Sequence, residues 1–99
     1  MINDEGRNWI RMCAAVDGFR ARYGARPTMI KIPSEIIDDL RIDLGDEMFE
    51  KVATRVKFIA DETGFIAEDN QGRQFDYAQE GFSKGSPDIP AATWFEIEY

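Results

Sequence analysis

The spacing of apolar residues changes near Val56, and this change limits the fold more than any other feature. Over most of residues 4–53, apolar side chains recur every three or four residues, the period of a helix with one buried face. From Val56 onward they alternate with polar ones, as in a half-buried strand. Helices followed by strands predict an α+β fold.

The pattern and its turn residues also predict the order of the elements. Gly24 ends a first helix, Pro33 ends a short strand, and Gly45 separates two short helices. We expect one domain over residues 1–99, with helices on one face of a mixed or antiparallel sheet of four or five strands. The expected elements are a helix over 4–23, a strand over 28–32, helices over 34–44 and 46–53, an antiparallel three-stranded meander within 56–78, and a strand over 93–99.

The same periodicity selects the residues of the expected core. They come from both helical and extended segments, and we expect them to form a single cluster. Gly18 lies within the first helix, where it weakens the helix by about 1 kcal/mol relative to alanine unless tertiary packing compensates. The expected core residues are Trp9, Val16, Phe19, Ile30, Ile32, Leu40, Phe58 and Phe75.

Charge is distributed unevenly along the chain, whose net charge is −7. Residues 1–31 hold six of the 12 basic residues and only three of the 19 acidic ones. The remaining segment is therefore strongly acidic, which argues against direct binding to a phosphate backbone and favours a basic partner. Arg7, Arg11 and Arg22 lie on one side of the first helix; they can contact phosphate or pair with acids of the same chain.

Six acidic residues within residues 38–50 form what we call the acidic surface. Its members are Asp38, Asp39, Asp43, Asp46, Glu47 and Glu50. Such a run can be only the solvated face of a helix, or it can present negative charge to a partner protein. We expect any natural partner to bind chiefly here.

The C-terminal segment TWFEIEY supplies a second candidate interface. Phe95 and Ile97 alternate with polar neighbours and are expected in the core, whereas an aromatic edge strand can also recruit another chain by strand addition. The candidate residues are Trp94, Glu96, Glu98 and Tyr99.

Catalytic, cofactor and metal sites are not indicated. The chain lacks histidine, the commonest general base, and its single cysteine, Cys13, lies among apolar residues where a thiol acts as a small hydrophobe. No phosphate-binding loop is present, and the acidic hairpin tip at 68–73 lacks the ligand spacing of a calcium loop, so it predicts a turn at Gly72. We expect no cofactor, no metal and no enzymatic activity.

These observations favour a small acidic protein-interaction or regulatory accessory protein of bacterial or phage type, with a basic protein as its partner. The alternative is an inhibitor that mimics DNA and occupies the nucleic-acid groove of an enzyme, as anti-restriction and anti-CRISPR proteins do. The absence of an apolar leader in residues 1–10 and of an 18-residue apolar stretch leads us to expect a cytoplasmic protein without membrane contact. The sequence leaves the oligomeric state open.

Overall fold

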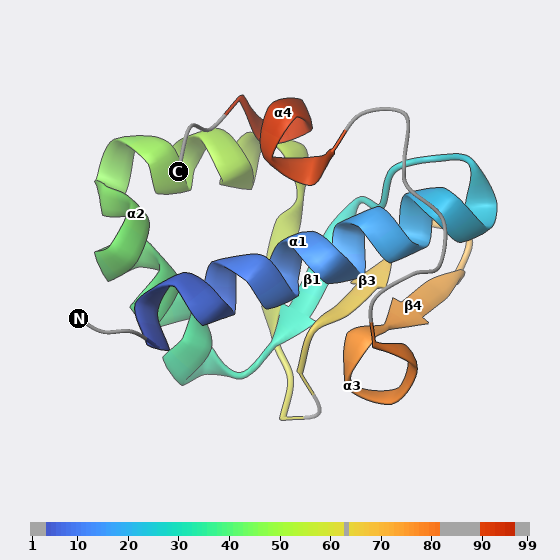
Figure 1. Cartoon of the computed structure of the whole chain (residues 1–99), viewed down its shortest axis with the longest axis horizontal. Helices are drawn as coiled ribbons and strands as arrows, with labels where there is room; N and C mark the ends of the chain where they lie inside the picture. The colour runs from blue at the N-terminus through green and yellow to red at the C-terminus, as the bar shows by residue number, and fades with distance from the viewer. Residues whose placement is uncertain (1–3, 63, 82–89, 97–99) are drawn as a thin grey trace.

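A computed structural model shows an α+β fold in which four helices pack on a four-stranded mixed sheet (Figure 1). It describes residues 4–62, 64–81 and 90–96, with the side chains of residues 4–7 left undescribed. The predicted fold class is therefore confirmed. The elements are α1 (Asp4–Tyr23), β1 (Met29–Ile32), α2 (Ser34–Arg55), β2 (Lys57–Ala60), β3 (Ile66–Glu68), β4 (Gln74–Asp76), α3 (Tyr77–Glu80) and α4 (Ala91–Phe95).

The sheet has the strand order β2-β1-β3-β4, which corrects the predicted meander. β2 does not pair with β3; it pairs in parallel with β1, with Ile30 opposite Phe58. β3 pairs antiparallel with the other side of β1 and forms a hairpin with β4. The reason is the long connection through α2, since parallel neighbours need a crossover of a dozen or more residues.

α2 contains the predicted break at Gly45, although the helix is continuous on either side of it. Gly45 has φ 81° and ψ 158°, a backbone conformation outside the helical region. The helix therefore changes direction there, as Figure 1 shows at the left of the molecule. The prediction of two helical pieces separated by this glycine is confirmed.

The expected C-terminal strand is wrong for the described residues 90–96, which form a short helix, α4. Ala91 and Phe95 are buried one helical turn apart, and the Ala91 N–H donates to Oδ1 of Asp17 at 2.8 Å. This carboxylate satisfies a backbone donor at the start of the helix, where no intrahelical acceptor exists. Packing on α1 and α2 thus overrides the alternating pattern of the segment.

One hydrophobic core joins the helices to one face of the sheet. Seven of the eight predicted core residues are buried there, and the eighth, Phe58, is half-buried and stacks on Phe49 with the ring centroids 4.9 Å apart. On the opposite face of the sheet, Lys31 forms an ion pair with Glu68 at 2.7 Å. The predicted core is therefore confirmed.

Candidate protein-interaction surface

The acidic surface lies along α2, on both sides of the bend at Gly45. Five of its six residues are exposed; the sixth, Asp43, is half-buried and has one buried carboxylate oxygen. The expectation of a solvent-facing acidic helix therefore fits every member except Asp43. Asp43 therefore presents only part of its carboxylate to solvent.

One basic residue lies within the span of the acidic surface, and its charge is directed partly inward. Arg41 lies 4.0 Å from Oδ1 of Asp46, while its guanidinium sits 4.3 Å from the centre of the Phe49 ring. The Asp46 side chain is 89 % exposed, so this pair is weak and leaves the carboxylate largely hydrated. The acidic surface thus keeps most of its negative charge available at the protein surface.

An exposed isoleucine accompanies these carboxylates. Ile42 is 78 % exposed, and it lies four residues after Asp38 and three after Asp39, on the same side of α2. Met48, beyond the bend, is also partly exposed at 36 %. Ile42 was not predicted as a surface residue, although its spacing from Leu40 and Leu44 places it opposite the buried face of the helix.

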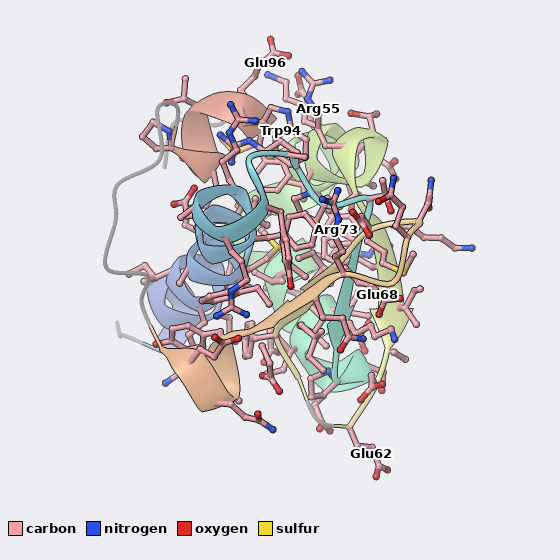
Figure 2. All side chains as sticks on the ribbon, turned by 90° about the vertical axis from the view of Figure 1, so that its right-hand side faces the viewer. Arg55, Glu62, Glu68, Arg73, Trp94 and Glu96 are labelled. Carbon is pink, nitrogen blue, oxygen red and sulfur yellow. The ribbon has the colours of Figure 1, made fainter. Side chains whose placement is uncertain are left out.

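The second candidate interface is mostly occupied by contacts within the chain. Trp94 is half-buried, with the Arg26 guanidinium 5.0 Å from its ring centre. Arg55 donates to the Trp94 carbonyl at 3.1 Å and to Glu96 at 2.5 Å, and Figure 2 shows these three labelled side chains close together. Glu98 and Tyr99 lie outside the described residues.

Two arginines, one in the first helix and one just after it, contact acids of the same chain, though not the acidic surface. Arg22 forms a two-point ion pair with Glu80 of α3, and Arg26, just after the helix, lies 3.6 Å from Asp17. Arg22 also lies over the Phe75 ring. These contacts join α3 and the segment after α1 to the first helix. Of the three arginines suggested as a phosphate-contact face, Arg22 is thus paired within the chain, while the side chain of Arg7 lies outside the described residues.

The acidic tip of the β3–β4 hairpin is a turn held by Asp69. One oxygen of its carboxylate accepts from the N–H groups of Gln71 and Arg73 at 2.9 and 3.0 Å, and the other from Arg73 Nε at 2.7 Å. Burial acts to raise the Asp69 pKa, but the bonds from Arg73 and from the two N–H groups outweigh it and lower the pKa. Asp69 therefore stabilises the turn, as predicted for this segment.

Reactive groups are few among the described residues. Burial, with a smaller effect from Asp17, raises the pKa of the Cys13 thiol to about 12, so it is a poor nucleophile at neutral pH. Within residues 4–62, 64–81 and 90–96, no group of three acidic or cysteine side chains could hold a metal ion. In the same ranges no helix is long and apolar enough to span a bilayer.

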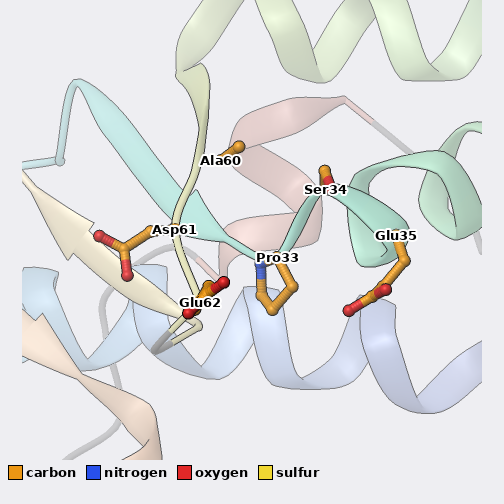
Figure 3. Close-up of a pocket in the computed structure, with 6 residues that line it drawn as sticks. All are labelled: Pro33, Ser34, Glu35, Ala60, Asp61 and Glu62. Atoms are coloured by element: carbon orange, nitrogen blue, oxygen red, sulfur yellow. The ribbon is translucent and has the colours of Figure 1, made fainter.

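A groove next to the acidic surface was not predicted. It has a volume of about 630 Å³ and lies between the start of α2 and the end of β2 (Figure 3). The groove cannot be read from the sequence, because residues 33–35 and 60–62 become neighbours only through the parallel β1–β2 pairing. Its lining residues are Pro33, Ser34, Glu35, Ala60, Asp61 and Glu62.

Comparisons with known proteins add no family to this description. No protein-family model, curated protein or solved structure matches the chain.

Proposed function

We propose that this chain is a non-catalytic interaction module whose acidic surface binds a basic surface of another protein. Support comes from the five exposed carboxylates of the acidic surface, which project from two helical segments on a well-packed core. Opposite charge on the partner speeds encounter and sets orientation, with an influence that extends about 10 Å at 0.1 M salt. We further propose a reducing, cytoplasmic setting, where the single, partly buried thiol of Cys13 remains reduced.

The observation that carries this proposal is the exposed Ile42 among the carboxylates. A single exposed apolar side chain is common on protein surfaces, but Ile42 lies among carboxylates. A helix face that served only for solubility would need the carboxylates and not the isoleucine. Interfaces bury an apolar centre inside a polar rim, and Ile42 beside Asp38 and Asp39 has that arrangement. The partner would then offer an apolar pocket bordered by lysine or arginine.

The DNA-mimic alternative uses the same carboxylates in a different way. A mimic presents negative charge at phosphate-like intervals to a nucleic-acid enzyme, and an apolar side chain has no counterpart in phosphate. The exposed Ile42 therefore favours recognition of a basic protein surface over mimicry of DNA. Competition between this chain and duplex DNA for a captured partner distinguishes the two functions, because only a mimic displaces DNA.

Affinity capture with matched baits tests the proposal. The baits are the wild-type chain, a charge-reversed variant with Asp38→Lys and Asp39→Lys, a charge-conserving variant with Asp38→Glu and Asp39→Glu, and Ile42→Ser. We expect one basic protein to be retained by the wild-type and charge-conserving baits and lost from the other two. Equal retention by all four baits would show that the acidic surface is not the binding site.

A further inference from the structure

The two edges of the sheet differ in how their outward backbone groups are used. At the β4 edge, the Gln74 carbonyl accepts from the Tyr23 hydroxyl at 2.8 Å, and the Asp76 side chain begins α3 by accepting from the Ala78 N–H. These contacts occupy the β4 edge, which protects it from pairing with another chain.

The β2 edge has no such protection among the described residues. The N–H groups of Lys57 and Asp61 donate to the Thr28 and Ile32 carbonyls, each at 2.9 Å, so these two residues face β1. Because backbone groups alternate along a strand, Ile59 also faces β1, and Phe58 and Ala60 face outward. Within the described part of the chain, neither of these outward residues has a hydrogen bond at its N–H or C=O.

The groove between α2 and β2 lies beside the outward end of this strand. Ala60 lines the groove and is exposed, although its side chain lies on the same face of the sheet as the buried Ile32. The helices therefore leave space over the end of β2. Figure 3 shows Glu35 and Glu62 on either side of Pro33, with Asp61 pointing away from them.

From this geometry we propose that β2 accepts an extended, basic segment of the partner protein as an additional strand. The N–H and C=O groups of Phe58 and Ala60 pair with the added backbone, as in strand addition to an open sheet edge. Lysine or arginine side chains of the segment lie beside Glu35 and Glu62 in the groove. Strand addition at β2 depends on the proposed function in one respect only, which is that the partner is positively charged.

The position of the groove joins it to the acidic surface. Glu35 lies four residues before Asp39 and three before Asp38, so the three carboxylates share one side of α2. One basic segment can therefore extend from the groove onto the acidic surface and stay close to carboxylates in both places.

A second copy of this chain is the competing occupant of the β2 edge. Antiparallel pairing of two β2 strands about a two-fold axis places both α2 helices on the same side of the joint sheet. The paired strands then run in opposite directions, so the groove of each copy lies beside the start of β2 in the other, and the oligomeric state decides between the two occupants.

A defined peptide tests the proposal on the full chain. The probe is a capped nine-residue peptide of alternating threonine and lysine, followed by NMR and by amide hydrogen exchange. We expect exchange at the Phe58 and Ala60 amides to slow when the probe binds, while the Ile59 amide is protected with or without it. Matched peptides carry glutamate in place of lysine, or N-methyl groups on alternate backbone nitrogens of the lysine form.

Both control peptides should bind at least roughly tenfold more weakly, the first through charge and the second through lost backbone hydrogen bonds. In the protein, Ala60→Pro removes an outward N–H while keeping the β1 pairing, since proline is tolerated on edge strands. Ala60→Val keeps that N–H and should bind like the wild type, whereas the proline variant should lose the probe.

Two results would overturn this proposal. In the first, the lysine peptide shifts resonances of Asp38, Asp39 and Ile42 but leaves exchange at Phe58 and Ala60 unchanged; the proposed function then stands without strand addition. In the second, sedimentation shows a dimer of the free chain whose Phe58 and Ala60 amides already exchange slowly. The β2 edge then belongs to a second copy.

Discussion

At the scale of single residues, Gly18 shows how packing reverses a local preference. Helix propensity alone favours alanine there by about 1 kcal/mol. However, a Cβ at this position would lie 2.2 Å from Cε1 of Phe75, whose ring is buried in the core. The glycine is therefore required by the approach of β4 to α1.

We predict that Gly18→Ala lowers the free energy of unfolding by about 1–3 kcal/mol, because overpacking outweighs the gain in helix propensity. Urea denaturation measures the change. In a Phe75→Leu background the same substitution should cost less, since the ring that obstructs the methyl group is gone. A Gly18→Ala protein more stable than wild type would contradict the packing of this helix on β4.

Asp69 gives a residue-scale prediction for pH. Its pKa in the folded chain is lower than the ordinary value of 3.8, so the unfolded chain takes up its proton first as pH falls. Its stabilising effect is therefore complete above about pH 5 and is lost as pH falls through the folded-state pKa. We predict that Asp69→Asn is less stable than wild type at pH 7, and that the difference narrows at pH 3. Urea denaturation at both values checks this; a constant difference would exclude the carboxylate charge as the cause.

At the scale of elements, the sequence predicted the helices, strands and turns whose type is determined by their own residue pattern. Helix α1, strand β1, the break at Gly45 and the β3–β4 hairpin follow from local periodicity and turn residues. The partner of β2 could not be predicted this way, because an alternating strand pairs equally well with either neighbour until α2 fixes its direction. Residues 93–95 were predicted as part of a strand but belong to α4. Ala91 and Phe95 fit both periods, and the decision comes from Asp17, 74 residues from Ala91.

The bend in α2 yields the element-scale prediction. The φ and ψ of Gly45 are nearly exclusive to glycine, while nothing lies within 4 Å of where a Cβ would be. Gly45→Ala should therefore cost about 1–3 kcal/mol through backbone strain alone. Thermal and urea unfolding measure it, with Glu47→Ala as an exposed control expected to change little. An unchanged stability in Gly45→Ala would mean that the bend is not fixed by this residue.

At the scale of the whole molecule, several arginines are paired within the fold, whereas the carboxylates of the acidic surface are mostly exposed. The described basic residues Arg22, Arg26 and Arg55 contact acids elsewhere in the fold, so their charge is largely neutralised within the chain. The carboxylates of the acidic surface have only Arg41 within their span. This segregation concentrates exposed carboxylates on α2, so among the described residues the acidic surface is a source of negative potential.

That segregation predicts how binding responds to salt and to charge reversal. Exposed charges act mainly on the rate of encounter, so association with the basic partner should slow as salt rises. Asp38→Lys with Asp39→Lys should slow association at low salt more than it speeds dissociation, and should remove most of the salt dependence. The pair Asp38 and Asp39 is chosen because both are exposed, whereas one Asp43 oxygen is buried and its replacement would disturb the fold. Surface plasmon resonance with the captured partner measures both rates, and Asp38→Glu with Asp39→Glu is the matched control. An unchanged association rate in the charge-reversed variant would place the binding site away from Asp38 and Asp39, because this change replaces two of the five exposed carboxylates of the acidic surface with positive charges.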